Sequence, residues 1–579
     1  MTRGSRLLSF LRSPYLWIMV VLFIVLFWSL PVVHITAPYS KILLDRNGQL
    51  LSARIAKDEQ WRFPPEDKSY PIFETALIHT EDKRFSNHWG VDPLAILRAI
   101  RLNFRHGAIK SGGSTLTMQV VRIARGNPKR IYSEKLYEMF LALRLEQSKT
   151  KAEILHMYIH NAPFGGNIVG VEAAAWRYFA RPPEELSWAE SSMLAVLPNN
   201  PALVHISRNR SRLQEKRDIL LRKLHEAGHF SEQDLALYLL EPIPRKPKAL
   251  PQKTPHLMFR PEKKWRIQTT IDKQLQEQVD QVIARHAIAL KSNRIHNISA
   301  LMIDTASAEV LAYVGNTLDF SSTDHGNHVD IVHARRSTGS LLKPFLYYSM
   351  LQEGELLPDE IIPDIPMNIN GFAPQNFDRG YKGALPASLA LARSRNIPAA
   401  WMLKNYGVER WYAELESWGM TTLHRKPDDY GLALILGGAE GTLWEMTSMY
   451  HNLAWSAEFH EEGRSRPALT WKQRERRPSE YQKMNPVSSW FVIQALKKVN
   501  RPQNSRIQPN TKENNVAWKT GTSYGFRDAW SIGFDPQTVV AVWVGNADSE
   551  GRADLTGHKA AAPILFDLLA LRKSQEDFD

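Results

Sequence analysis

The stretch Ser340-Leu341-Leu342-Lys343 places a hydroxyl and an amine one helical turn apart, on the same face of a predicted helix. In this arrangement the amine can take the hydroxyl proton and activate serine, which is otherwise a weak nucleophile. The pattern alone is weak, because Ser148-Lys149-Thr150-Lys151 also matches it. A second short motif, Ser394-Arg395-Asn396, likewise has a duplicate at Ser207-Arg208-Asn209. Neither motif by itself predicts an active site.

The order and spacing of the motifs distinguish the Ser340 and Ser394 motifs from their duplicates. Only Ser340 is followed by the Ser394 motif and then by the chain's single Lys-Thr-Gly sequence, Lys519-Thr520-Gly521. This third motif leads into two predicted strands, Ala529–Phe534 and Val539–Val544, and an edge strand there could hold a peptide. Three such motifs in this order are typical of β-lactamases and penicillin-binding proteins.

The region from about Asn297 to Phe566 resembles the transpeptidase domain of penicillin-binding proteins. The resemblance implies an α+β fold similar to that of β-lactamases. Further matching stretches are Arg336-Ser337-Thr338-Gly339-Ser340, Pro374-Gln375-Asn376-Phe377-Asp378, Tyr430-Gly431-Leu432 and Lys519-Thr520-Gly521-Thr522-Ser523.

The resemblance implies a role in acyl transfer for each motif residue. Ser340 would attack the D-Ala-D-Ala carbonyl, with Lys343 as its base. Ser394 would relay a proton to the leaving D-alanine, and Asn396 would orient the peptide amide. The terminal carboxylate would be bound by Lys519, Thr520 and Thr522. β-Lactam antibiotics would be covalent inhibitors.

Three implied features concern the backbone around the nucleophile. The N–H groups of Ser340 and Thr522 would form the oxyanion hole. Gly521 would let the substrate approach its strand, because glycine has no Cβ. Thr338 departs from the family, which usually has proline at this position. We expect a looser turn there but no loss of a reacting group.

A second group of polar residues lies far upstream, from Glu81 to Asp92. Its three acids and one histidine could form only a solvated turn. The following stretch, Pro93–Ser133, has eight Lys and Arg residues and no acid. The helix predicted there has an apolar face with Leu97, Ile100 and Phe104, and a basic face with Arg98, Arg101 and Arg105. A basic amphipathic helix of this kind suits a membrane surface.

The small, hydroxylated run Gly112-Gly113-Ser114-Thr115-Leu116-Thr117-Met118-Gln119 could surround phosphate oxygens. With the features above, it resembles the peptidoglycan glycosyltransferase domain of class A penicillin-binding proteins, across about Lys41 to Ala249. The resemblance implies a mostly helical, lysozyme-like fold. Met118 and Asn161-Ala162-Pro163-Phe164-Gly165-Gly166 match the 1C branch of the family, whereas Glu134 replaces a residue that is usually basic. The extra C-terminal domain common in that branch is not expected, since the sequence stops soon after Leu571.

The implied glycosyl transfer needs two separated carboxylates, as in inverting glycosidases. Glu81 would take the proton from the 4-hydroxyl of the incoming lipid-linked disaccharide, lipid II, which attacks the anomeric carbon of the growing chain. Glu138 would assist departure of the lipid pyrophosphate, with positive charge from Arg122, Arg130 and Lys135. The other substrate-binding residues would be Asp82, Phe85, His88, Ser114, Thr115 and Gln119. No second ligand is spaced to bind a metal with His88. No metal site and no required cofactor are expected, and stimulation by a divalent cation is left open.

The N-terminus predicts a membrane anchor. Residues Ser13–Ser40 contain no Asp, Glu, Lys or Arg, and Tyr15–Val33 is rich in large apolar residues. About 20 such residues span a bilayer as a helix. The preceding Arg3, Arg6 and Arg12 place the N-terminus in the cytoplasm. The alternative is a cleaved signal peptide, whose apolar part is shorter. We expect a single-pass protein of a bacterial inner membrane, with its catalytic domains in the periplasm.

Composition and spacing complete the predicted organisation. The chain has 579 residues and no cysteine, which excludes disulfides, thiolate zinc sites and a cysteine nucleophile. Its net charge of +13 indicates an anionic partner, and no nucleic acid is expected. The proline- and lysine-rich stretch Pro242–Arg266 is interpreted as an extended connector. The expected parts are a tail and anchor at 1–40, a glycosyltransferase domain at 41–245, a linker at 246–296 and a transpeptidase domain at 297–579.

The sequence thus predicts a bifunctional peptidoglycan synthase that polymerises lipid II into glycan strands and cross-links their stem peptides. Three alternatives remain at this point. The first domain could hydrolyse glycans, although its basic amphipathic region argues against a soluble substrate. The chain could be a non-catalytic β-lactam sensor or scaffold. The serine site could belong to a carboxypeptidase or β-lactamase, because water and amine acceptors use the same site. Protein partners, oligomeric state and the acceptor peptide are left open.

Overall fold

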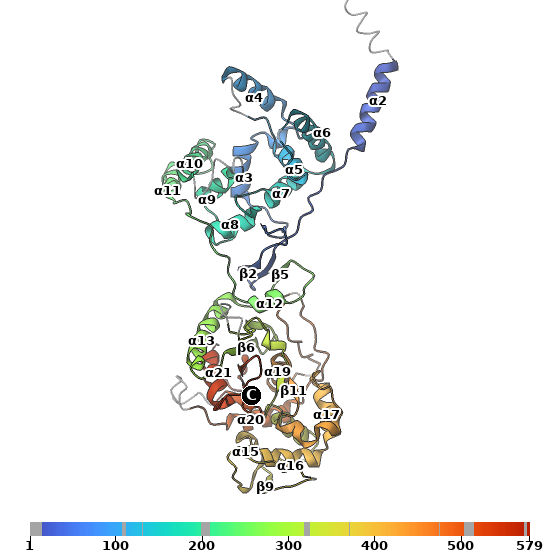
Figure 1. Cartoon of the computed structure of the whole chain (residues 1–579), viewed down its shortest axis with the longest axis vertical. Coiled ribbons are helices and arrows are strands. Elements are labelled where there is room, and N and C mark those ends of the chain that lie inside the picture. The colour runs from blue at the N-terminus through green and yellow to red at the C-terminus, as the bar shows by residue number, and fades with distance from the viewer. Residues whose placement is uncertain are drawn as a thin grey trace, which may run out of the picture. The chain divides into compact units, whose positions relative to one another are not determined.

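The computed structural model describes residues 14–106, 112–129, 131–198, 209–317, 325–369, 371–461, 463–473, 475–502, 515–572 and 576–578. The chain forms two compact units (Figure 1). The first comprises Met1–Ile42, Ala53–Pro251 and Lys263–Arg266. The second comprises Leu43–Ser52, Gln252–Glu262 and Ile267–Asp579. A three-stranded sheet of order β2–β1–β5 consists of β1 (Lys41–Leu44), β2 (Leu50–Arg54) and β5 (Arg266–Gln268).

The first unit is mainly helical, as the sequence predicts. Its elements are α2 (Pro14–Ser29), β3 (Trp61–Arg62), α3 (Pro71–Glu81), α4 (Pro93–His106), α5 (Leu116–Ala124), α6 (Tyr132–Ser148), α7 (Lys151–Asn161), β4 (Ile168–Val169), α8 (Val171–Phe179), α9 (Trp188–Val196), α10 (Arg210–Glu226) and α11 (Glu232–Leu240). Thr150 and Glu153 form a capping box at the start of α7. Helix α3 packs against α9 and α10, and α5 packs against α6 and α7. This packing decides which polar residues of the sequence motifs meet.

The apolar N-terminal segment forms α2, which begins at Pro14, one residue before the span predicted at Tyr15–Val33, and ends at Ser29, four residues before the end of that span. Its 16 residues reach about 24 Å, less than the roughly 30 Å of a bilayer's hydrocarbon core. None of the helices in the described part of the chain is both long enough and apolar enough to cross a membrane. The predicted transmembrane anchor therefore stays a prediction.

The second unit is an α+β domain, also as predicted. Its helices are α12 (Pro255–Phe259), α13 (Lys273–Lys291), α14 (Lys343–Gln352), α15 (Ala387–Ala392), α16 (Asn396–Tyr406), α17 (Val408–Ser417), α18 (Pro427–Tyr430), α19 (Leu443–Glu458), α20 (Pro486–Lys497) and α21 (Ala562–Leu569). Its strands are β6 (Asn297–Asp304), β7 (Val310–Val314), β8 (Arg336–Ser337), β9 (Ile361–Asp364), β10 (Gly383–Pro386), β11 (Glu440–Gly441), β12 (Ala517–Thr522), β13 (Asp528–Phe534) and β14 (Thr538–Gly545). The main sheet is antiparallel, with the order β12–β13–β14–β6–β7.

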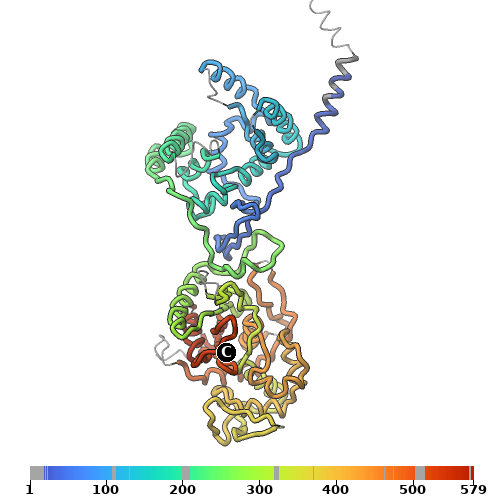
Figure 2. The backbone as a smooth tube through the Cα atoms, in the orientation of Figure 1, coloured from blue at the N-terminus to red at the C-terminus, as the bar shows by residue number. Residues whose placement is uncertain are grey.

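The main sheet is covered on both faces. Along β14, Val540, Val542 and Val544 share one core with residues of α13 and α21, whereas Val539, Ala541 and Trp543 share the other with residues of α14, α19 and α20. Alternate residues of a strand point to opposite faces, so a strand covered on both faces is apolar throughout. Figure 2, coloured by residue number, follows the chain from the green-yellow β6 to the red β14 beside it. The sequence predicts the neighbouring strands β13 and β14 but not the pairing of β14 with β6, because that contact joins segments far apart in the chain.

The predicted linker at 246–296 contains folded elements. The prediction of an extended connector is wrong at Pro255–Phe259, which forms the short helix α12. Proline fits at the first position of a helix, because the N–H that it lacks would have no partner there. Helix α13 belongs to the second unit, because Val279, Val282 and Ile283 on its apolar face enter that unit's core. The structural division therefore places residues 267–296 with the second unit.

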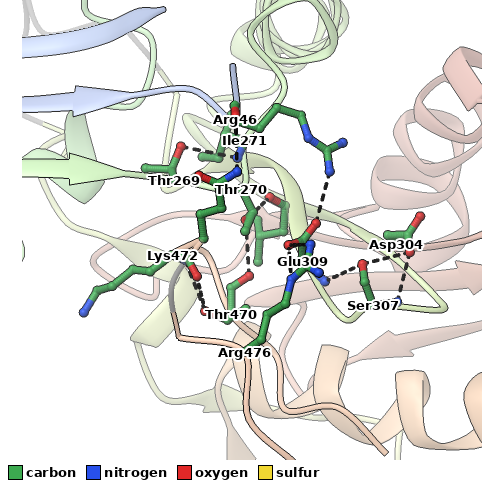
Figure 3. Close-up of polar contacts among 12 residues, drawn as sticks. Arg46, Thr269, Thr270, Ile271, Asp304, Ser307, Glu309, Thr470, Lys472 and Arg476 are labelled. Atoms are coloured by element: carbon green, nitrogen blue, oxygen red, sulfur yellow. Dashed lines mark hydrogen bonds and ion pairs between the residues drawn. The ribbon is translucent and has the colours of Figure 1, made fainter. Parts of the chain in front are cut away.

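Ion pairs and hydrogen bonds tie distant segments to the β6–β7 turn of the second unit (Figure 3). The buried Glu309 carboxylate accepts hydrogen bonds from Arg46 at 3.1 Å and from two nitrogens of Arg476 at 2.6 and 2.8 Å. The Thr270 hydroxyl donates to the Val310 carbonyl at 2.7 Å. A single buried acid thus joins the segments around residues 46 and 476 to the sheet that carries the Lys-Thr-Gly motif.

Candidate active sites

The Ser340–Lys343 motif forms the turn that opens α14. The Lys343 N–H donates to the Ser340 carbonyl at 3.3 Å, so the hydroxyl and the amine belong to one helical turn, as predicted. The Tyr450 hydroxyl, from α19, donates to the Leu341 carbonyl at 2.7 Å. The turn of the proposed nucleophile, called the nucleophile turn below, is therefore anchored on a buried helix of the same core.

The Lys343 amine lies in the interior, and the residue is only 1% exposed. The amine donates to the carbonyl oxygens of Ser394 at 2.8 Å and Arg395 at 3.2 Å and to Asn396 Oδ1 at 2.7 Å. Burial, followed by the positive charges of Lys519 and Arg395, holds the pKa of Lys343 well below its usual value. A lysine in this state loses its proton readily and can act as a base beside Ser340.

Ser394 lies against the amine of Lys519. The Lys519 amine donates to Ser394 Oγ and to the Thr520 carbonyl, both at 2.7 Å. Burial lowers the pKa of Lys519 to about 7. Ser394 has a φ of +52°, a conformation that residues with a Cβ seldom adopt and that is found at functional sites. Lys519 can thus bind a carboxylate as a cation, and the Ser394 hydroxyl is placed to pass on a proton.

The Asn396 side chain is oriented by two partners. Its Oδ1 accepts from Lys343, and its Nδ2 donates to the Gln375 carbonyl at 2.8 Å. The preceding Arg395 donates to Asp364 Oδ2 from two nitrogens, at 2.7 and 2.9 Å. Sequence reasoning missed Asp364 and gave Arg395 no role, although the position of Arg395 inside the motif was a signal.

Two glycines bring the nucleophile turn against β12. Gly339 has a φ of +55°, and a Cβ there would lie 2.6 Å from the Thr522 nitrogen. A Cβ on Gly521 would lie 2.6 Å from the Thr338 carbonyl oxygen. The space predicted to admit substrate at Gly521 is therefore filled by the protein's own turn, and the glycine is needed for that close approach.

Thr338 tightens the turn where a looser one was expected. Its N–H and its hydroxyl both donate to the Ala439 carbonyl, at 3.2 and 3.1 Å. Proline has no N–H and no hydroxyl, so it could make neither hydrogen bond. The departure from the usual family residue thus replaces ring rigidity with two hydrogen bonds.

The Lys-Thr-Gly motif lies on β12, an edge strand of the main sheet. The prediction placed an edge strand in the hairpin that follows, but β13 and β14 are interior strands. Thr520 and Thr522 are half-buried on β12, and the Thr522 hydroxyl accepts from the Gly557 N–H at 3.0 Å. The motif itself therefore offers the sheet edge along which a peptide could lie.

In the first unit, Glu81 ends α3 and meets α5. Gln119 Nε2 donates to Glu81 Oε2 at 2.8 Å, and the Tyr158 hydroxyl donates to Gln119 Oε1 at 3.2 Å. The structure brings the predicted residues Glu81 and Gln119 together. Tyr158 was missed, because its apolar helix face predicts only a core residue.

Four of the predicted substrate-binding residues have partners inside the protein. The buried Asp82 accepts from His88 Nε2 at 2.9 Å and from the Leu116 N–H at 3.0 Å. Phe85 is buried beneath the Lys151 amine, which lies 4.5 Å from the ring centre. Thr115 caps the start of α5. Its hydroxyl accepts from the backbone N–H of Met118 and donates to the Gly90 carbonyl. These contacts fix the segment just after Glu81 against the start of α5.

The carboxylate of Glu138 is buried among positive groups. Arg122 Nη1 lies 3.8 Å from Glu138 Oε1, and Lys135 Nζ lies 4.0 Å from Oε2. The Lys135 amine also donates to Ser114 Oγ. These four predicted residues come together, whereas Arg130 lies outside the described residues. Two cations and a hydroxyl around one acid can hold an anion such as a pyrophosphate.

Glu134, the unexpected acid, forms an ion pair with Arg125 at 2.5 Å. It occupies the first turn of α6, where a negative side chain is favourable. Within the described residues, no group of three or more acidic, histidine or cysteine side chains could hold a metal ion. The predictions about cofactors and divalent cations stay predictions.

Comparisons with known proteins address both units. A family model described as Transglycosylase matches residues 47–225, and one described as Penicillin binding protein transpeptidase domain matches residues 298–570. Penicillin-binding protein 1C of Escherichia coli K12 is 33% identical over 93% of this chain and 68% of its own length. Penicillin-binding protein 1B of Vibrio cholerae is 27% identical over 90% of this chain and 70% of its own length.

A solved structure supports the fold. The crystal structure of penicillin-binding protein 1A from Haemophilus influenzae superposes with a TM-score of 0.50 and 15% identity, covering 94% of both chains. Both domain models match this one chain, and a relative is 33% identical to it over most of both lengths. These matches together assign the chain to a family. The chain belongs to the class A penicillin-binding proteins, which build peptidoglycan with a glycosyltransferase domain and a transpeptidase domain.

Proposed function

We propose that Ser340 is the nucleophile of the transpeptidase domain and Lys343 its base. Ser340 Oγ attacks the carbonyl carbon of the penultimate D-alanine, and its proton passes to the neutral Lys343 amine. The C–N bond to the terminal D-alanine then breaks, and the leaving amine takes a proton through Ser394. An amine of a second stem peptide attacks the acyl ester, forms the cross-link and releases Ser340. The observation that carries this proposal is the convergence of Lys343 and Lys519 on the Ser394 motif, next to the nucleophile turn.

The remaining transpeptidase residues bind the substrate in this proposal. The terminal carboxylate lies against Lys519, with Thr520 and Thr522 on the same edge strand. The oxyanion of the tetrahedral intermediate is held by the N–H groups of Ser340 and Thr522. Support comes from the short approach of the nucleophile turn to β12 at Gly339. Asn396, already held by its two partners, presents its amide to the peptide.

In the glycosyltransferase domain we assign Glu81 as the base. It takes the proton from the 4-hydroxyl of lipid II while that oxygen attacks the anomeric carbon of the growing strand. The bond to the lipid pyrophosphate breaks on the opposite face, as inversion requires. Arg122 and Lys135 stabilise the leaving pyrophosphate, and Glu138 orients these two cations. The support is that Glu81 and Glu138 lie on different helices, in separate groups of polar contacts.

The protein works at the outer face of a bacterial inner membrane in this proposal, with α2 as part of a single-pass anchor and the N-terminus in the cytoplasm. Helix α4 supports it, because apolar side chains on one of its faces are exposed, with Leu97 at 63% and Phe104 at 91%. Tyr132, at the start of α6, is 94% exposed. Apolar side chains next to arginines suit a lipid surface with anionic headgroups.

The proposed function is tested by incubating the purified protein with lipid II, with and without penicillin. Without penicillin we expect polymer whose stem peptides are cross-linked, and with penicillin polymer of similar amount without cross-links. Release of D-alanine without any cross-link would instead indicate a carboxypeptidase. Release of muropeptides from purified wall without synthesis of polymer would indicate a glycan hydrolase.

The membrane contact is tested by the double change Leu97→Ser and Phe104→Ser. Each side chain contributes roughly 1.5–3 kcal/mol when it is removed from water, so the change weakens the membrane contact by about 3 kcal/mol or more. We expect polymerisation of lipid II in anionic vesicles to fall at least about tenfold, but little change with a water-soluble, short-chain substrate. The matched control is Ile288→Ser, an exposed apolar residue of the second unit. An equal loss with both substrates would contradict the membrane role of α4.

A further inference from the structure

A chain of two hydrogen bonds ends on Glu81. The Tyr158 hydroxyl donates to Gln119 Oε1 at 3.2 Å, and Gln119 Nε2 donates to Glu81 Oε2 at 2.8 Å. The three residues come from α7, α5 and the end of α3. Tyr158 has no role in the proposals above, yet only the Gln119 amide separates its hydroxyl from the proposed base Glu81.

The chemistry of the three side chains allows only one donor-to-acceptor direction for the two hydrogen bonds. An ionised carboxylate can only accept hydrogen bonds, so the Gln119 amide must turn its NH₂ group toward Glu81. The carbonyl oxygen of the same amide then faces Tyr158, whose hydroxyl donates. A buried carbonyl that loses its donor is destabilising, so Tyr158 holds the amide in the orientation that serves Glu81.

Tyr158 can remain a donor at every pH at which the enzyme works. The residue is 1% exposed. Burial, followed by the negative charge of Glu81, raises the pKa of Tyr158 well above its usual value. The hydroxyl therefore keeps its proton, and the direction of the chain does not reverse as the pH rises.

Other charged groups around α3 have partners of their own. Among the described residues of the helices that pack against α3, the acid of α9 and the buried arginine of α10 form ion pairs, namely Glu190 with Arg181 and Arg217 with Asp218. On α3 itself, the ring of His79 packs against that of His229. The neighbouring Asp82 is bound by His88. Gln119, from α5, donates a hydrogen bond to Glu81.

We propose that Tyr158 is a positioning residue for glycosyl transfer, which orients the Gln119 amide so that this amide keeps Glu81 ionised as the base. The inference rests on the proposed role of Glu81. An N–H donor favours the charged form of a carboxylate. Without the Tyr158 hydroxyl the amide rotates, and Glu81 takes up a proton at a higher pH.

The test is Tyr158→Phe in the full chain, with the rate of lipid II polymerisation measured against pH. The acid-side pH of half-maximal rate should rise by about 0.5–1 unit, and the maximal rate should fall about threefold to tenfold. The matched control is Tyr178→Phe, which removes another buried hydroxyl of the same unit, one that donates to the Phe164 carbonyl at 2.8 Å. This control should leave the acid-side pH where it is in the wild type.

A second variant makes the result independent of the stability of Tyr158→Phe. Gln119→Ala should shift the acid limb in the same direction, and adding Tyr158→Phe to it should produce no further shift, because the two residues act through one chain. An unchanged pH profile in Tyr158→Phe, or a further shift in the double variant, would overturn the inference. Normal polymerisation by Glu81→Gln would instead overturn the role of Glu81, so the two failures are distinguishable.

Discussion

Ser340→Ala will abolish covalent labelling of the protein by fluorescent penicillin and will stop cross-linking of stem peptides. Removing the hydroxyl removes the atom that forms the acyl bond in the proposed mechanism. Neither Lys343 nor Ser394 can replace it, because the Lys343 amine is bound to the Ser394 carbonyl and Ser394 Oγ accepts from Lys519. We expect a loss of at least about a thousandfold in the acylation rate. Labelled protein is measured by in-gel fluorescence over a time course.

The matched control for this variant is Ser349→Ala, which removes a serine hydroxyl from α14, the helix that follows the Ser340 turn. Ser349 donates to the Phe345 carbonyl in the interior, away from Ser340, so its variant should still be labelled. Polymerisation of lipid II by Ser340→Ala should continue, since that reaction belongs to the other unit. Labelling that persists at a different serine would contradict the assignment of Ser340 as the nucleophile.

The same acylation assay has an expected dependence on pH. In the proposed mechanism Lys343 acts as a base without its proton, and burial favours that form because it lowers the pKa of Lys343. Lys519 binds the carboxylate with its proton, and the pKa of Lys519 is about 7. The second-order rate constant of acylation, which reports on the free enzyme, should therefore fall as the pH rises above about 7. In Lys519→Arg the guanidinium stays charged, so this fall should disappear.

Glu81→Gln will stop conversion of lipid II to polymer while leaving penicillin labelling intact. Glutamine has nearly the same shape but cannot accept the proton of the attacking hydroxyl, so the loss is that of the general base, about 10²–10⁴-fold. Polymer is measured by separating radiolabelled glycan strands from lipid II. Penicillin labelling of Ser340 in the same sample reports that the second unit is folded.

The control for this variant is Glu153→Gln, a carboxylate on the neighbouring helix α7. Glu153 belongs to a capping box with Thr150, and its hydrogen bonds with Lys149 and Thr150 lower its pKa to about 2. It should polymerise lipid II at nearly the normal rate. Equal loss in both variants would point to damage to the helices rather than to a missing base.

The sequence predicted most of the groups that meet in the two sites, because their motifs are local. Ser340 and Lys343 share one helical turn, and the Thr150 capping box is a contact between residues three positions apart. The order of the three transpeptidase motifs was enough to choose Ser340 over the duplicate at Ser148. The predicted span at Tyr15–Val33 is also a local property, but the helix observed there is shorter.

Contacts between distant segments were beyond the sequence. Tyr158 looked like a core residue, since its apolar neighbours share a helix face, and only the packing of α7 against α5 places its hydroxyl on Gln119. In the same way, Arg395 meets Asp364 only because β9 and α16 are packed together.

From the sequence alone followed the two domains and their order, a glycosyltransferase domain and then a transpeptidase domain, together with the side chains that we propose as reacting groups. Short motifs are enough for these inferences, because each motif consists of residues close together in the sequence. The tertiary structure alone decided the state of those groups. Burial sets the pKa of Lys343, and the turn beside β12 occupies the space next to Gly521. Both effects depend on which surfaces exclude water from one another, and such surfaces exist only after distant segments have packed.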